Sequence, residues 1–136
     1  MSIIHKTIII NTNNDIELID ITEDIQSILR SHEIHNGIIN ISTKHTTSAI
    51  VINENENGLK KDYINFLREI VPKKEYYHDL IDNNARSHLM ALFTTANQTL
   101  PIIDSMINLG TWQSIFFVEL DGPRRNRVIN ITIMGE

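Results

Sequence analysis

Residues 44–56 read KHTTSAIVINENE, and this stretch decides the expected fold. Its middle, SAIVINE, is rich in β-branched residues and predicts a strand. The small hydroxyl side chains at its start leave two interpretations open. One is an exposed strand end, where threonine is a good strand former. The other is a strand that a ligand approaches closely, where hydroxyl groups supply hydrogen bonds.

Further strands are predicted on both sides of this stretch. Residues 5–22 read as two strands around a polar turn at residues 11–15, which favours a hairpin. The other candidate strands are IINIS at 38–42, LPIID at 100–104, TWQSIFFVEL at 111–120 and RVINITIMG at 127–135. The last two are joined at Asp121-Gly122-Pro123, a sequence typical of a tight turn.

Three helices are expected between the strands. Thr22 is the candidate cap of a short helix, and Asn36-Gly37 ends it. Residues 58–71 give the clearest helix, because their apolar residues recur at helical spacing. Residues 83–93 suggest a shorter one. Strands outnumber helices and do not alternate regularly with them, so the sequence predicts one α+β domain over residues 1–136.

Composition excludes several classes of function. The chain has 12 Lys and Arg against 17 Asp and Glu, a net charge of −5, which disfavours a nucleic-acid partner. With no cysteine, thiolate catalysis, thiolate metal sites and disulfides are excluded together. No stretch approaches membrane-spanning length and no signal-type apolar run opens the chain, so we expect no membrane partner and a cytoplasmic location.

Histidines lie in three of the polar clusters. His45 starts the first strand stretch, His78 lies in a probable loop and His88 lies on the helix over residues 83–93, four residues after Asn84. Three histidines from a strand, a loop and a helix can converge on Zn²⁺. The alternative is that each is a hydrogen-bonded residue at the border of the core, and spacing alone does not decide between them.

The segment ELDGPRRNRV is the most basic stretch of an acidic protein. Its first interpretation is a solvated turn. Its second is an anion site, because the guanidinium groups of Arg124, Arg125 and Arg127 match phosphate oxygens.

Taken together and in order, these pieces resemble one family. HTTSA, INENE, a downstream Asp62, YYHD, NARSHL, LGTWQ and ELDGPR are similar to the successive signatures of the YjbQ-like family, also called secondary thiamine-phosphate synthases. The resemblance runs from about Gly37 to the C-terminal MGE. It departs from the family at LMALFTTANQTLP, where Thr94 and Thr95 stand near an expected glycine.

The resemblance implies a small α+β fold with a mixed β-sandwich, two or three helices, and assembly as a homotrimer. It also implies a metal site of His45, His78 and His88, for which we expect zinc, or magnesium with a pyrophosphate substrate. Further implied site residues, for catalysis or ligand binding, are Thr46, Thr47, Ser48, Glu54, Asp79, Asn84, Asp121 and Arg124.

The resemblance further implies a transferase acting on a small phosphorylated substrate. A pyrimidine-methyl pyrophosphate would lose pyrophosphate, and its carbon would be captured by the nitrogen of a thiazole phosphate. Arg124 would hold the leaving group, and Asp79 or Glu54 would orient a ligand or the metal. Metal-assisted hydrolysis of a phosphate ester and a non-catalytic metal- or ligand-binding module are the alternatives.

Isoleucine content bears on assembly but leaves two alternatives open. Of 136 residues 26 are Ile, and TIIIN at 7–11 and SIFFVE at 114–119 are apolar on both strand faces. Either a second layer of the same chain or another subunit must cover the second face. With the resemblance, we expect a closed trimer whose site lies near the subunit interface.

Overall fold

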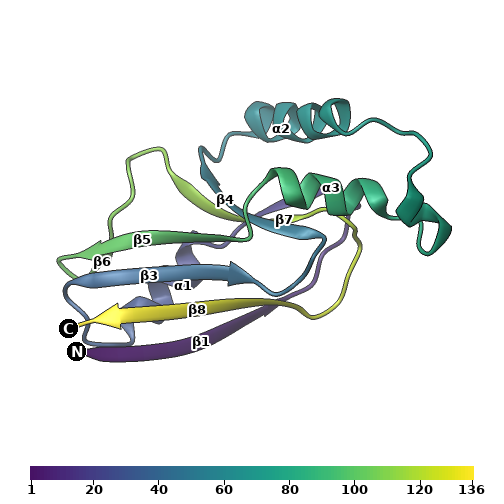
Figure 1. Ribbon diagram of the computed structural model, residues 1–136. Coiled ribbons are helices and arrows are strands. Elements are labelled where there is room, and N and C mark those ends of the chain that lie inside the picture. The colour runs from purple at the N-terminus through teal and green to yellow at the C-terminus, as the bar shows by residue number, and fades with distance from the viewer.

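Two antiparallel sheets face each other in the computed structural model, which describes residues 1–136 (Figure 1). The larger sheet has the strand order β1 (Ser2–Ile10), β8 (Arg127–Gly135), β3 (Gly37–Thr43), β5 (Asn97–Ile103) and β6 (Met106–Ile107). The smaller sheet has the order β2 (Glu17–Asp20), β7 (Ser114–Glu119) and β4 (Ser48–Asn53).

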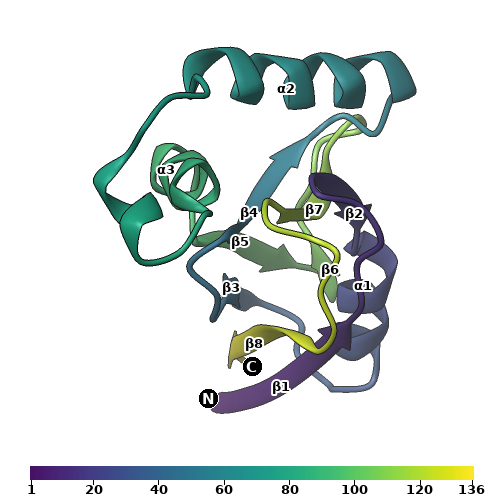
Figure 2. The same cartoon turned by 90° about the vertical axis from the view of Figure 1, so that its right-hand side faces the viewer.

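Three α-helices complete the fold. α1 (Thr22–Arg30) lies at the side of the two sheets, whereas α2 (Asn57–Ile70) and α3 (Ala85–Phe93) lie over the free face of the smaller sheet (Figure 2). A short 3-10 helix, η1 (Tyr77–Leu80), connects α2 to α3. The smaller sheet is therefore the middle of three layers.

Each face of the smaller sheet supports its own apolar core. Ile115 and Phe117 of β7 point into a core with α1 and the larger sheet, while Phe116 and Val118 point into a second core with α2 and α3. All four of these side chains are at most 1% exposed. This is why SIFFVE is apolar on both faces: one chain covers both of them.

The α+β class and the two-sheet sandwich are confirmed, and every strand pairing is antiparallel. The hairpin expected over residues 5–22 is wrong. β1 pairs with β8 while β2 pairs with β7, so residues 11–16 cross from one sheet to the other. β7 and β8 likewise belong to different sheets, so the Asp121-Gly122-Pro123 turn is a second crossover.

These two crossovers pack against each other. The backbone N–H of Thr12 donates to the carbonyl of Arg124 at 2.9 Å, and the N–H of Arg124 donates to Thr12 Oγ1 at 2.9 Å. Gly122 lies so close to the other segment that a Cβ there would stand 2.0 Å from the carbonyl oxygen of Asn14. Only glycine fits that approach.

A buried ion pair joins the sheets at the same place. Arg127 begins β8 and Glu119 ends β7, and their side chains form a doubly hydrogen-bonded pair, with 2.8 Å from Nε to Oε1. Glu119 also accepts from Thr12 Oγ1 at 2.7 Å and from the N–H groups of Leu120 and Asp121 at 3.0 Å. Burial alone would raise the pKa of Glu119, but these hydrogen bonds outweigh it and lower the pKa.

Two local expectations about α1 need correction. The helix begins at Thr22 itself, with Ile21 at the cap position and no side-chain cap. The Thr22 hydroxyl instead accepts the backbone N–H of Ile115 at 2.8 Å, which fastens α1 to β7. The helix ends at Arg30, so Asn36-Gly37 follows a separate loop and starts β3.

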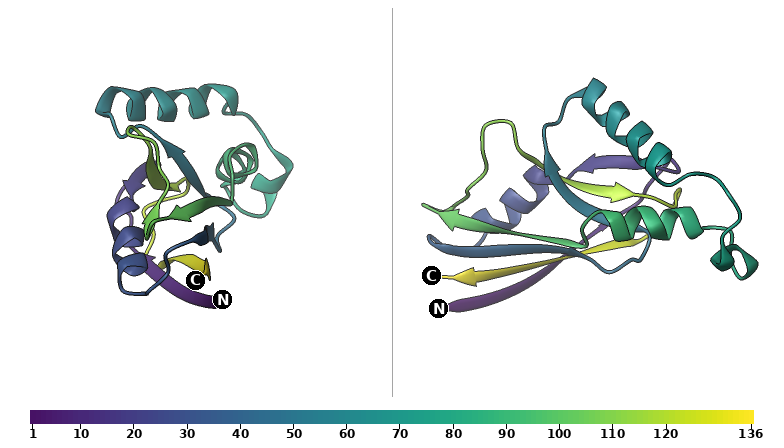
Figure 3. Two further views of the ribbon diagram at one scale, coloured as in Figure 1. Left: turned by 90° about the vertical axis from the view of Figure 1, so that its left-hand side faces the viewer. Right: turned by 45° about the horizontal axis from the view of Figure 1, so that its top comes forward.

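The outer face of the larger sheet carries no helix (Figure 3). Ile3, Ile9 and Ile38 on this face are 61%, 62% and 44% exposed. Exposed apolar groups of this kind are compatible with assembly, and the homotrimer stays a prediction.

The two chain ends meet at one end of the sandwich. The N-terminal amine of Met1 lies 3.6 Å from Oε2 of Glu136, and Figure 1 shows both termini together, far from the crossovers.

The buried pair predicts that Arg127→Met is strongly destabilising. Methionine keeps the bulk of the side chain but leaves the Glu119 carboxylate buried without its cation, a change that typically lowers the free energy of unfolding by about 3–5 kcal/mol. Urea unfolding of both proteins measures the difference. Arg30→Met is the matched control, because it breaks the exposed pair with Glu23 and should change stability by about 1 kcal/mol or less. Equal effects of the two substitutions would contradict the prediction.

Candidate functional site

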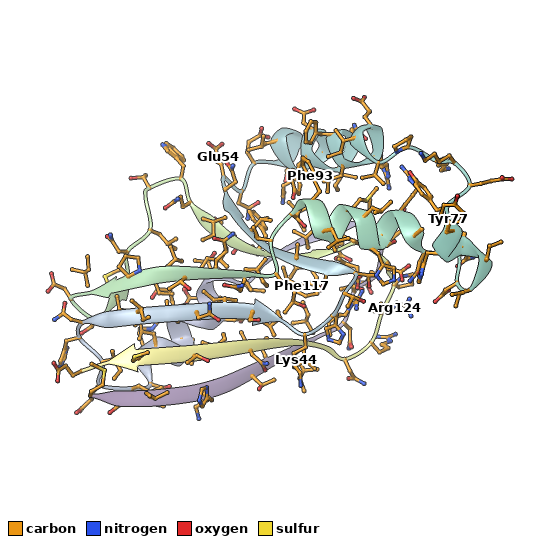
Figure 4. All side chains as sticks on the ribbon, in the orientation of Figure 1. Lys44, Glu54, Tyr77, Phe93, Phe117 and Arg124 are labelled. Carbon is orange, nitrogen blue, oxygen red and sulfur yellow. The ribbon has the colours of Figure 1, made fainter.

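A polar pocket opens beside the crossovers, with a volume of about 480 Å³ and no hydrophobic lining residue. Three segments build it: the β3–β4 turn, the start of α3 with the residues before it, and the crossover between β7 and β8. Figure 4 places Lys44 and Arg124 at this end of the molecule. The lining residues are Lys44, His45, Thr46, Thr47, Asp82, Asn84, His88, Asp121, Arg124, Arg125 and Arg127.

Two further cavities adjoin it through His88. One, of about 410 Å³, shares Lys44, His45, Thr46 and His88 with the first, and the other, of about 310 Å³, includes His78. His88 lines all three, and no hydrogen bond occupies its ring nitrogens within the chain. Its imidazole is therefore the central free group of the site.

The hydroxyl-rich stretch is a turn, since β3 ends at Thr43 and β4 begins at Ser48. Thr43 Oγ1 and Ser48 Oγ lie 2.7 Å apart, Ser48 Oγ donates to the His45 carbonyl at 3.1 Å, and Thr43 Oγ1 accepts from the His45 N–H at 3.2 Å. Thr47 is also used internally, because its hydroxyl accepts from Arg127 at 3.0 Å. Of the predicted hydroxyl ligands, Thr46 alone is exposed to the pocket.

His45 has a defined hydrogen-bonding state. Its Nε2 accepts the backbone N–H of Val128 at 2.8 Å. Burial lowers the pKa of His45, and the positive charge of Arg127 lowers it further. A neutral ring that accepts at Nε2 must carry its proton on Nδ1. His45 therefore offers a donor to the pocket, and its Nε2 is already used.

A hydrogen-bonded chain crosses the floor of the site. Arg124 Nη2 donates to Asp121 Oδ2 at 2.7 Å, and Asn84 Nδ2 donates to the same oxygen at 2.9 Å. Because the carboxylate only accepts, Asn84 must turn its amide nitrogen toward it, and the Asn84 oxygen then faces His78 Nε2 at 2.9 Å. His78 must therefore donate from Nε2. This series of hydrogen bonds fixes the side chains of Arg124, Asp121, Asn84 and His78 relative to one another.

The three predicted metal ligands do not form one site in this arrangement. His78 and His88 are close, with ring centroids 4.7 Å apart and an edge-to-face geometry. His45 turns its acceptor nitrogen to the backbone, and no group of three or more His, Cys, Asp or Glu side chains is placed to hold a metal ion. The residues as arranged do not fit a three-histidine zinc site, and metal binding itself stays a prediction.

Two predicted residues, Glu54 and Asp79, line neither the polar pocket nor the two cavities that adjoin it. Glu54 follows the far end of β4, six residues from Ser48, so about 20 Å of strand separates it from the His45 turn. It lines a different, apolar cavity. Asp79 accepts the backbone N–H of Ala85 at 3.1 Å, so it fixes the start of α3.

The pocket also contains Lys44 and Asp82, which the sequence did not single out. Arg125 and Arg127 were named there as guanidinium groups of a candidate anion site, and both line the pocket. Arg127 is neutralised by Glu119 and Arg124 is paired with Asp121. Lys44 and Arg125 have no carboxylate within 4 Å, so they are the unpaired cations of the pocket.

Fold and pocket together define a small two-sheet α+β protein with a polar site at the sheet crossovers. The family model described as UPF0047 protein YjbQ-like matches residues 6–136, and the chain belongs to this family. The family resemblance of the motifs is thereby confirmed.

Relatives match along the whole chain. A UPF0047 protein of Methanothermobacter thermautotrophicus is 47% identical over all of this chain and 95% of its own length. The UPF0047 protein YugU of Bacillus subtilis is 35% identical over 96% of this chain and 98% of its own length. A crystal structure of a YbjQ-like protein of unknown function from Sulfolobus solfataricus is 41% identical, covers 99% of both chains and superposes with a TM-score of 0.97.

The state of His45 predicts that acid weakens the fold. The pKa of His45 is lower in the folded chain than its ordinary value of 6.5. Stability is therefore complete above about pH 6.5 and is lost as the pH falls toward the folded pKa, because the unfolded chain takes up the proton first. A protonated Nε2 would also face the Val128 N–H donor.

His45→Gln tests this, because its amide oxygen can accept the same hydrogen bond and does not titrate. Urea unfolding at about pH 7.5 and about pH 5 should show a smaller loss of stability in the variant than in the parent protein. The other five histidines are common to both proteins and cancel in the comparison. An equal loss in both would refute the role of His45.

Proposed function

We propose that the protein is an enzyme that acts on a small molecule and holds a phosphate or diphosphate group of its substrate in the polar pocket. The observation that carries this proposal is the pair of unpaired cations, Lys44 and Arg125, in a pocket with no hydrophobic lining. The chain as a whole has a net charge of −5, so this local excess of positive charge is not a property of the surface at large. Lysine and arginine beside neutral donors are the groups that bind phosphate oxygens.

Neutral donors complete the proposed anion site. His45 offers Nδ1–H, and Thr46 offers an exposed hydroxyl from the same turn. Arg124 contributes a guanidinium that Asp121 holds in place through the 2.8 Å bond from Nε to the backbone carbonyl and the contact to the carboxylate. Donors fixed before the substrate binds need no reorganisation when charge develops on a leaving group.

The reaction we propose is transfer with diphosphate as the leaving group, of the thiamine-phosphate synthase type. The carbon–oxygen bond of a pyrimidine-methyl diphosphate breaks, and its electron pair leaves with the diphosphate. The lone pair of the thiazole nitrogen forms the new carbon–nitrogen bond, so that the ring becomes a thiazolium and no proton is transferred. The pocket residues would stabilise the negative charge of the leaving group.

Hydrolysis of a phosphate ester is the second candidate, and the free imidazole of His88 is the observation that favours it. No hydrogen bond holds its ring nitrogens, and it borders the polar pocket. An imidazole in that state can accept a proton from water or donate one to a leaving group.

Two measurements test the proposal. Purified protein is assayed with the two thiamine precursors together and, separately, with a panel of phosphate esters. The proposal expects thiamine phosphate to form; turnover of the esters alone would sink the synthase reaction and favour the hydrolase. Turnover of neither, with diphosphate binding retained, would favour a non-catalytic binding module.

Diphosphate binding itself is measured by titration calorimetry. Lys44→Gln and Arg125→Gln should each weaken it about 10- to 100-fold, since a charge-assisted hydrogen bond contributes about 1.5–3 kcal/mol. Arg30→Gln removes an arginine of comparable exposure on α1, far from the pocket, and should leave the affinity unchanged. Equal affinity of all four proteins would contradict the anion site.

A further inference from the structure

An apolar cavity lies between the first half of α2 and the smaller sheet, and it shares no residue with the polar pocket. Its volume is about 160 Å³. An apolar cavity of about 150 Å³ accommodates a benzene molecule, so this one has the size of one aromatic ring. Its hydrophobic lining comes from β2, β4, β7 and α2 and consists of Leu18, Val51, Ile52, Leu59, Tyr63 and Phe116.

The cavity exists because α2 packs closely on the sheet only in its second half. Figure 2 shows the helix lying above β4 and β7. Leu67 is the one fully buried residue of this helix, whereas Leu59, about two turns earlier, is 38% exposed. Leu59 and Tyr63 are four residues apart and share one face of the helix. Part of the apolar stripe of α2 therefore has no side chain of this chain packed against it.

Two opposite charges without a partner stand at the rim of the cavity. Glu54, in the loop after β4, and Lys60, near the start of α2, both line it and are half-buried. Neither side chain has an oppositely charged group within 4 Å, so the two do not pair with each other. A half-buried charge with no partner keeps only part of its hydration, and a ligand of opposite charge would restore the lost interactions.

A neutral donor completes the rim. The side-chain oxygen of Asn53 accepts the backbone N–H of Glu54 at 2.7 Å, and its amide nitrogen remains free to donate. The rim thus offers one anion, one cation and one neutral donor beside an apolar interior. A molecule that matches all of these features carries an ammonium group, a carboxylate and one apolar group.

We propose that this cavity binds an apolar α-amino acid. Its side chain would fill the space under α2, its ammonium group would face Glu54, and its carboxylate would face Lys60 and Asn53. Burial of the side chain supplies the hydrophobic part of the affinity, and the charge-assisted hydrogen bonds supply selectivity. Glu54 lies about 20 Å along β4 from the His45 turn, so this site is separate from the proposed phosphate site. Figure 4 likewise shows Glu54 well apart from Arg124.

Titration calorimetry with three ligands that share a phenyl group tests the proposal. L-Phenylalanine carries both charges, phenylethylamine lacks the carboxylate, and phenylpropionate lacks the ammonium group. L-Phenylalanine should bind about 10- to 100-fold more tightly than either of the others, because each of them loses one charge-assisted hydrogen bond. Equal affinity for all three ligands, or no binding of L-phenylalanine, would overturn the proposal.

Two variants assign each ligand charge to its partner. Glu54→Gln should weaken the binding of L-phenylalanine and phenylethylamine but not that of phenylpropionate. Lys60→Gln should weaken the binding of L-phenylalanine and phenylpropionate but not that of phenylethylamine. Lys61→Gln is the matched control, because Lys61 is exposed and does not line the cavity, and it should leave all three affinities unchanged. If both cavity variants bound the three ligands as the wild type does, the assignment would be refuted.

A third variant fills the cavity. Leu59→Trp should abolish the binding of L-phenylalanine, and a circular dichroism spectrum like that of the wild type shows that it is folded. If it does not fold, Val51→Ile, which adds one methyl group to the cavity wall, should weaken the same binding. Lys60→Gln and Leu59→Trp should bind diphosphate as the wild type does, which separates this site from the polar pocket. A folded Leu59→Trp with undiminished affinity for L-phenylalanine would contradict the proposal.

Discussion

The Glu119–Arg127 ion pair is the interaction on which the rest of the structure depends. It joins the last residue of β7 to the first residue of β8, and so joins the two sheets where the chain crosses between them. A buried pair is favourable only when its remaining hydrogen-bonding positions are filled. Here Thr12, Thr47 and two backbone N–H groups fill them, and each comes from a segment that also borders the pocket or its crossovers.

The same pair shapes the charge of the site. Arg127 lines the pocket, but Glu119 neutralises it, so its contribution is to hold Thr47 and the His45 turn in position. Burial and the positive charge of Arg127 both lower the pKa of His45, and the hydrogen bond that its Nε2 accepts from Val128 fixes the proton of the neutral ring on Nδ1. Free positive charge is left to Lys44 and Arg125 at the pocket wall. Arginines with and without a carboxylate partner therefore stand side by side in one short segment.

Local sequence patterns predicted the helices and strands, but they did not predict which strands pair with one another. The apolar stripe of residues 58–71 and the β-branched run after Thr47 gave α2 and β4 nearly to the residue, because periodicity is a property of one segment. Which strands pair depends on segments about 100 residues apart, and nearness along the chain wrongly suggested that residues 5–22 form a hairpin. The pocket was found through its motifs. The sequence did not predict the structural roles of Thr47, Ser48 and Asp79. It does not show that their side-chain oxygens form hydrogen bonds with the protein's own backbone and with Arg127.

The contact between Met1 and Glu136 makes the chain nearly a closed loop. New ends could therefore be opened elsewhere, and the hairpin at Asp104 and Ser105 is a natural cut because both residues are exposed or half-buried at the tip of β5 and β6. Circular permutation there would join the old termini by a short linker and leave the crossovers intact. Tags or fusion partners attached to the present termini are, for the same reason, carried on the end of the sandwich remote from the pocket.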